Sequence, residues 1–170
     1  MKPRQPDPRK FDVVAAAADA AVLEGSWPLV SFARIVEGDG HDGDVQWSVR
    51  GERRPMTGHE PEIWLHVAAH ACVWRECQRC LEPVALHLDV ARALRFVADE
   101  ALAEALDPDS EDDVLALPRR LDLHTLVEDE LLLALPLVPM HDQCPRQLSM
   151  SAGHLAGEAE AQPARSPFAA

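Results

Sequence analysis

The chain contains no tyrosine, and aromatic residues make up only 5% of its 170 residues. It also lacks the run of ~20 apolar residues that a membrane-spanning helix needs. The longest apolar stretch, residues 131–140, is shorter and is interrupted by Pro136 and Pro139. Near the start, residues 13–18 form a small apolar run that is too short and too weakly apolar for a secretory leader. We therefore expect a cytoplasmic protein without a membrane anchor.

Motifs of the common enzyme classes are missing as well. The sequence has no nucleophile motif that would indicate a Ser/His/Asp triad, no glycine-rich phosphate loop and no dinucleotide fingerprint. The acidic triplet Glu128-Asp129-Glu130 is better interpreted as a solvated helix face than as paired catalytic carboxylates. These absences predict that the protein is not an enzyme.

Basic residues are scarce relative to acidic ones. The chain has 16 Lys and Arg against 29 Asp and Glu, a net charge of −13, which disfavours nucleic-acid binding by electrostatics alone. The charge is uneven, because residues 99–113 are strongly acidic and contain no basic residue, whereas residues 1–10 are mostly basic. A local basic face is compatible with this pattern, and the acidic patch is suited to a basic partner protein.

The most extensive pattern in the sequence consists of two long runs of alternating apolar and polar residues. They cover residues 62–74 and 84–97, and the segment between them contains Cys77, Cys80 and Pro83. Period-two alternation on both sides of a segment that ends in proline is typical of a β-hairpin, with the C-x-x-C at its tip. With a further strand at 45–51 and a short strand or turn at 22–25, we expect an antiparallel sheet.

Helical patterns flank this sheet. We expect a short helix at 13–18, a second one opening at Pro28 with an apolar face, a helical turn at 100–106 that runs into a solvated loop, and a longer helix at 122–135 that Pro136 ends. The apolar face of the second helix comprises Leu29, Phe32, Ile35 and Val36, and that of the longest helix Leu126, Val127, Leu131 and Ala134.

The predicted fold is α+β: an antiparallel sheet built on a long hairpin, with short N-terminal helices and one longer C-terminal helix packed on it. We expect a flexible arm at 1–10, one domain at 11–145 and a disordered tail at 146–170.

Two pairs of metal-binding residue types stand about 60 residues apart. Cys77 and Cys80 form one pair, and His141 and Cys144 form the other. A two-residue gap lets a turn aim both ligands at one ion, so the four together are candidates for a structural zinc site. Two unrelated reduced thiol sites are the alternative. A thioredoxin-like redox pair fits less well, because that chemistry needs a helix N-terminus and this pair lies between two strands.

Four other residues of these types receive no ligand role. Cys72 is interpreted as a small apolar core residue. His66, His70 and His87 are interpreted as surface residues or cross-strand neighbours.

Two motifs in this order resemble the YceD family, the large ribosomal RNA subunit accumulation proteins. They are Cys77-Gln78-Arg79-Cys80-Leu81-Glu82-Pro83 and the helical stretch that runs from Asp122 through Val127-Glu128-Asp129-Glu130-Leu131 to His141. The resemblance covers about residues 20–145, and Ser166–Ala169 looks like a shortened form of the Asn-Pro-Phe-Ala ending of some relatives. It implies a non-enzymatic ribosome-biogenesis factor that supports synthesis, processing or stability of 23S-type rRNA. The implied partner is a large-subunit pre-ribosomal particle or a large-subunit ribosomal protein. The alternatives are a thiol-disulfide or metal-handling protein acting through Cys77 and Cys80, and a direct RNA-binding protein.

Overall fold

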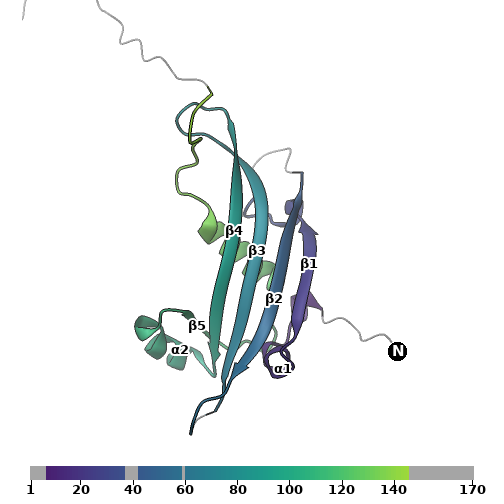
Figure 1. The fold of residues 1–170 in the computed structure, drawn as a ribbon, viewed down its shortest axis with the longest axis vertical. Helices are drawn as coiled ribbons and strands as arrows, with labels where there is room; N and C mark the ends of the chain where they lie inside the picture. Colours follow the sequence, from purple (N-terminus) through teal and green to yellow (C-terminus); the bar gives the residue numbers. More distant parts are fainter. Residues whose placement is uncertain (1–6, 37–41, 59, 146–170) are drawn as a thin grey trace, which may run out of the picture.

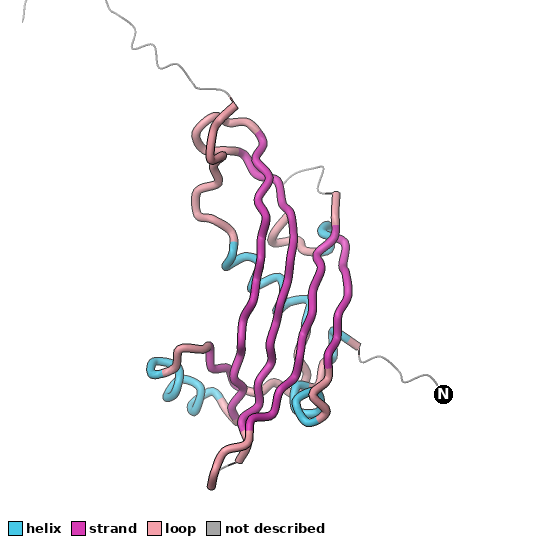
Figure 2. The backbone as a smooth tube through the Cα atoms, viewed as in Figure 1, coloured by secondary structure: helices cyan, strands magenta, loops and turns pink. Residues whose placement is uncertain are grey.

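The protein folds into two layers, a five-stranded sheet and a helix that crosses one of its faces (Figure 1, Figure 2). The computed structural model describes residues 7–36, 42–58 and 60–145. The predicted tail at 146–170 and most of the predicted N-terminal arm lie outside these residues. Strand order in the sheet follows the chain, β1-β2-β3-β4-β5. The elements are α1 (Val13–Ala18), β1 (Val22–Pro28), β2 (Asp44–Arg54), β3 (Glu62–Glu76), β4 (Pro83–Val97), α2 (Glu100–Leu106), β5 (Asp113–Ala116) and α3 (Leu123–Ala134).

The hairpin of β3 and β4 is the longest feature of the sheet, as the alternation predicted. Its register runs without interruption from Ile63 opposite Phe96 to Glu76 opposite Pro83. Successive side chains of a strand point to opposite faces. The odd-numbered residues from Leu65 to Val73 therefore lie in the core, while the even-numbered ones face the open side of the sheet.

Helix α3 covers the other face of the sheet. Asp122 caps it by accepting hydrogen bonds from the backbone N–H groups of His124 (2.9 Å) and Thr125 (3.3 Å). Val127 and Leu131 are fully buried, as predicted, and Leu126 is half-buried. Ala134 was also expected in the core, but it is exposed. The reason is that the helix crosses the sheet diagonally, so its last turn lies beside the edge of β4 (Figure 1).

The sheet is mixed, so the prediction of a purely antiparallel sheet was wrong. Strand β5 pairs with Leu94–Val97 of β4 in parallel. Its four residues begin at Asp113, the last residue of the acidic segment, whose end was expected to be a solvated loop. Helix α2 supplies the crossover that a parallel pair requires.

The prediction of a second N-terminal helix beginning at Pro28 was also wrong. Pro28 is the last residue of β1, and Leu29–Ser31 form a 3-10 turn. Phe32 N–H donates to the Leu29 carbonyl at 3.0 Å and Ile35 N–H to that of Phe32, also at 3.0 Å. Successive turns of this kind bury the same apolar side chains that a helix face would bury. The spacing of these residues therefore indicated a helix where the chain forms turns.

Gly51 of β2 is where α1 comes closest to the sheet. A Cβ atom at this position would lie 2.4 Å from the backbone C and O atoms of Ala16, and these cannot move as a flexible side chain can. We expect Gly51→Ala to lower the free energy of unfolding by ~1–3 kcal/mol, the usual range for overpacking. Urea unfolding followed by circular dichroism measures this. The matched control is Gln46→Ala on the open face of the same strand, expected to change stability by less than ~0.5 kcal/mol. Equal values for both variants would contradict the packing of α1 on β2.

Candidate metal centre

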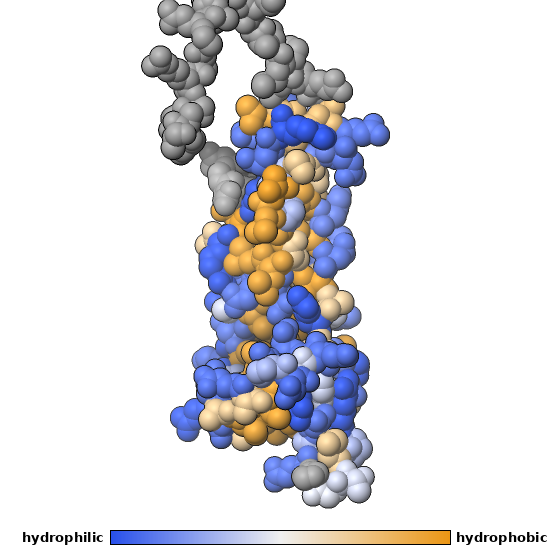
Figure 3. All heavy atoms as spheres, turned by 90° about the vertical axis from the view of Figure 1, so that its left-hand side faces the viewer, coloured by the Kyte–Doolittle hydropathy of each residue, from blue (hydrophilic) through white to orange (hydrophobic). Residues whose placement is uncertain are grey.

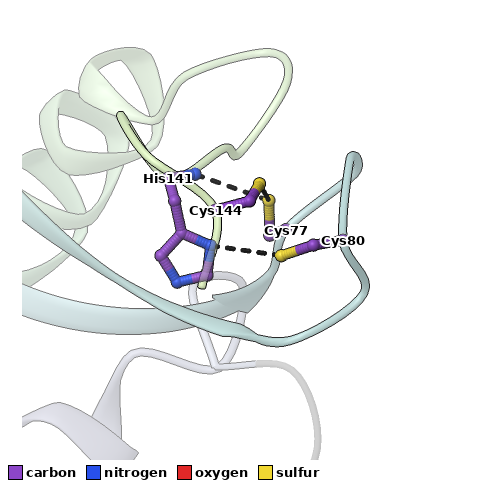
Figure 4. Close-up of side chains that lie close together, drawn as sticks. All are labelled: Cys77, Cys80, His141 and Cys144. Carbon is purple, nitrogen blue, oxygen red and sulfur yellow. Dashed lines mark hydrogen bonds between the residues drawn. The ribbon is translucent and has the colours of Figure 1, made fainter. Parts of the chain in front are cut away.

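The C-x-x-C pair lies in the turn at the tip of the β3–β4 hairpin (Figure 4). Cys77 N–H donates to the carbonyl of Glu82 (3.0 Å), and Leu81 N–H donates to the carbonyl of Cys77 (2.8 Å), which closes a tight turn. Leu81 has a φ of 64°, a left-handed conformation that is uncommon for a bulky residue. This turn places both thiols inward, so that Cys77 and Cys80 are buried.

The segment after α3 brings the second pair to the same place. Pro136 ends the helix, and the carbonyl of Pro139 accepts a hydrogen bond from Gln78 N–H at the hairpin tip (2.9 Å). The backbone N–H of His141 then donates to Cys77 Sγ (3.4 Å). As a result, one candidate ligand atom from each of Cys77, Cys80, His141 and Cys144 lies within 4.8 Å of all the others. The structure thus brings together all four residues that the sequence singled out.

The hydrogen bonds of His141 determine which nitrogen is available to a metal. Its Nε2 lies 3.1 Å from the Pro83 carbonyl oxygen, which can only accept, so Nε2 carries the proton. Its Nδ1 lies 3.4 Å from Cys80 Sγ and faces the cluster (Figure 4). Metal-ligating histidines commonly donate their other ring N–H to a carbonyl or carboxylate, which orients the ring.

Arg79 is a member of this site that the sequence analysis missed. Its Nε donates to Cys144 Sγ at 2.9 Å, and one of its terminal nitrogens donates to the His141 carbonyl at 2.8 Å. The hydrogen bond to Cys144 raises the pKa of Arg79. The sequence contained a signal for this role, because Arg79 stands between the two cysteines of the C-x-x-C motif. A cation in that position stabilises neighbouring thiolates.

The two thiols of the hairpin tip differ in acidity. Burial raises the pKa of Cys77, but backbone N–H groups of His141, Arg79 and Cys80 outweigh it and lower that pKa to about 5. Burial and the neighbouring sulfurs of Cys144 and Cys77 raise the pKa of Cys80 to about 11. The site therefore already favours one thiolate, and a bound cation would favour the others.

The cysteine and histidines of the strands, which were given no ligand role, lie away from this cluster. Cys72 is half-buried on the open face of the sheet, opposite His87, and not in the core as expected, because it is an even-numbered residue of β3. His66 lies 2.5 Å from Glu52, and His70 lies 2.6 Å from Asp89. Both are cross-strand neighbours, as predicted.

The acidic triplet of α3 is not the solvated face that the sequence suggested. Glu128 and Glu130 are 8% and 7% exposed, respectively. Glu128 forms an ion pair with Arg34 (2.7 Å), and Glu130 lies 3.5 Å from Arg92. Burial raises the pKa of Glu130, and the nearby carboxylates of Asp113 and Asp129 act in the same direction. Each carboxylate has its own arginine from a distant part of the chain, so the two do not form a catalytic pair.

A serine–histidine contact joins the N-terminal region to α3. Ser31 Oγ lies 2.9 Å from His124 Nε2, but the single Ser31 proton is donated to the Pro28 carbonyl (2.8 Å). His124 is thus the donor to Ser31, which leaves it unable to act as a base toward that hydroxyl. The His124 ring also stacks on Phe32 with centroids 4.2 Å apart. The contact positions α3 against the chain that follows β1.

Comparison with known proteins places the chain in a family. No solved structure matches it. Within the described residues, none of the helices has the length and apolar character needed to cross a bilayer. A family model, described as large ribosomal RNA subunit accumulation protein YceD, matches residues 65–170, which include the hairpin tip, α3 and all four clustered ligands. The family name indicates a role in accumulation of the RNA of the large ribosomal subunit. The chain belongs to the YceD family.

Proposed function

We propose that this protein is a non-enzymatic, cytoplasmic ribosome-biogenesis factor that supports synthesis, processing or stability of 23S-type rRNA. It acts by binding a large-subunit pre-ribosomal particle or a large-subunit ribosomal protein, and residues 11–145 are its folded domain. Membership of the YceD family is the observation that carries this proposal. The acidic net charge of −13 supports a protein partner over bare RNA, because phosphate groups are repelled by such a chain.

We further propose that Cys77, Cys80, His141 and Cys144 hold one structural Zn²⁺. The observed Cys77 Sγ to Cys144 Sγ distance is 3.8 Å, and the Cys80 Sγ to His141 Nδ1 distance is 3.4 Å. In a tetrahedron with ordinary zinc bond lengths, two sulfurs lie about 3.8 Å apart, and a sulfur and a nitrogen about 3.6 Å. A donor set of three cysteines and one histidine is typical of closed structural sites, which keep no open position for substrate.

Such an ion would join two segments that are far apart in the chain. The hairpin tip would be tied to the segment that leaves α3, which would fix the helix against the sheet. Three thiolates and one dication carry a single net negative charge, and the guanidinium of Arg79, 2.9 Å from Cys144 Sγ, would balance it. In this arrangement, the role of Arg79 between the two cysteines is to neutralise the charge of the metal site.

The redox alternative is not favoured by the geometry. Reactive C-x-x-C pairs place the first cysteine, partly exposed, at a helix N-terminus, whereas Cys77 and Cys80 lie in the turn of a β-hairpin and are 0% and 4% exposed. The pKa of Cys77 is low because backbone N–H groups of His141, Arg79 and Cys80 donate to its sulfur, and not because of a helix N-terminus.

Depletion of the protein tests the proposed function. We expect large-subunit precursors to accumulate and 23S-type rRNA to fall by about half or more relative to the small-subunit RNA, since assembly-linked RNA is degraded when assembly stalls; the protein should co-sediment with those precursors. Sucrose-gradient profiling with mapping of precursor RNA ends measures both. Unchanged particle profiles after full depletion would refute the proposal. Tight, steeply salt-dependent binding to protein-free rRNA would instead favour a direct RNA-binding protein.

A further inference from the structure

Most of the outer edge of β4 has no partner strand. Strand β5 pairs only with Leu94–Val97, and within the described residues no other strand lies against residues 83–93 on that side. Two contacts show which backbone groups point outward. The Val97 carbonyl accepts from Leu117 N–H, and the Pro83 carbonyl accepts from His141 Nε2, both on the outer side. Because the register with β3 has no bulge, the odd-numbered residues between them also direct their backbone N–H and C=O groups outward. These are Ala85, His87, Asp89, Ala91 and Ala93.

This edge has few of the features by which proteins block strand pairing. Residues 84–93 contain no lysine and no proline. At the opposite edge of the sheet, β1 is shorter and ends in Pro28. Unpaired edge groups are a template on which another extended chain can add as a strand.

A groove lined by both apolar and polar residues runs beside the same edge. It measures about 670 Å³, and its lining includes Val84, Leu86 and Leu88 on the β4 side and Pro136 and Met140 on the side of the segment after α3. Figure 3 looks onto this edge and shows hydrophobic side chains gathered over its upper half, between polar regions above and below. Met140, which lines this groove, is 49% exposed, and the preceding Leu137 and Val138 are exposed beside a separate pocket that Gln78 and Arg34 also line. Contiguous exposed apolar surface of this kind marks interaction sites.

The charges at the edge indicate the chemistry of the occupant. Exposed carboxylates of Glu82, Asp89 and Asp142 lie along it, whereas Arg92 is engaged by Glu130 at 3.5 Å. With a net charge of −13, a second copy of this chain would be repelled. An added strand would direct alternate side chains into the groove and the others toward the open face beside Asp89.

We propose that an extended segment of a basic partner protein, with alternating apolar and basic side chains, adds to β4 as a strand along residues 85–93. This rests on the proposed function, in which the partner is a large-subunit ribosomal protein. The candidate metal centre borders the groove through His141, and a bound ion would hold the wall formed by residues 136–142 in place.

Hydrogen exchange gives a signature specific to this mode of binding. The probes are large-subunit precursor particles from depleted cells, individually purified basic large-subunit proteins, and protein-free 23S-type rRNA, each with the full-length chain purified without chelators. With the particles and with one of the proteins, we expect the amides of the odd-numbered residues 85–93 to exchange about tenfold slower or more. The even-numbered amides of β4 already pair with β3 and should change little.

Matched substitutions test whether the amides carry the binding. Ala91→Pro removes one outward N–H and should weaken binding by about tenfold, whereas Ala91→Val keeps it and should stay within about threefold. His87→Pro and His87→Val form a second pair in case Ala91→Pro fails to fold, and zinc content and melting temperature verify folding.

The other outcomes overturn the inference. Particle binding with unchanged β4 amides would place the contact elsewhere and leave the proposed function intact, whereas no particle binding at all would refute the proposed function. Protection by protein-free rRNA would make the edge an RNA site. Protection in the free chain would assign it to a second copy if it rises with concentration, or to residues 146–170 if it disappears in a chain ending at Pro145.

Discussion

Protein purified without chelators is expected to contain one zinc ion per chain. Substituting any one of Cys77, Cys80, His141 or Cys144 should reduce the zinc content to well under one ion per chain. A site that relies on four ligands to join two segments loses both the ion and the link when one ligand is removed. Elemental analysis together with a thiol titration measures this. The matched control is Cys72→Ser, which lies on the open face outside the cluster and should leave the zinc bound.

Removing the ion should also destabilise the fold. Metal binding is linked to folding, so a chelator should lower the melting temperature, and a loss of ~3 kcal/mol would lower it by roughly 6–12 °C in a chain of this size. Well under one zinc per chain, with thiols that titrate freely while the fold persists, would show that the site does not exist. In that case the Cys77–Cys80 pair would be a turn element, or the redox hypothesis would gain support.

Leu131→Ala is expected to lower the free energy of unfolding by ~2–5 kcal/mol, because it leaves a cavity between α3 and the sheet. Leu131 is fully buried in a core that includes Leu65 and Val67 of β3. Leu133→Ala is the matched control, since it lies two residues away on the same helix and is 72% exposed. Its effect should stay below ~0.5 kcal/mol. Denaturant unfolding of both variants gives the difference, and a loss below ~0.5 kcal/mol for Leu131→Ala would rule out the packing of α3 on the sheet.

Local patterns in the sequence predicted the elements that bury one face of a regular structure. Alternation identified β3 and β4, because one face of each strand lies against α3 and the period of two is imposed along its whole length. The cap at Asp122, the helical spacing of Val127 and Leu131, and the stop at Pro136 identified α3 to within two residues. The two pairs of candidate ligands were identified because each pair lies within one turn and can be recognised without tertiary information.

The errors concern contacts that join distant parts of the chain. Strand β5 has only four residues, and its parallel pairing with β4 depends on a crossover that its own sequence does not encode. Glu128 and Glu130 were predicted to be solvated because their partners, Arg34 and Arg92, belong to segments far away in sequence. Burial of a carboxylate depends on such a partner, since an unpaired buried charge is costly.

The sequence by itself therefore determined the α+β class, the hairpin with C-x-x-C at its tip, the final helix and the identity of the candidate ligands. These follow from periodicity, caps and proline, which act over a few residues. Only the tertiary structure decided that the four candidate ligand atoms lie within 4.8 Å of one another, that Arg79 faces Cys144, and that β4 keeps an open edge beside a groove. Each of these depends on where α3 ends relative to the sheet. That position results from the packing of the whole core rather than from any local pattern.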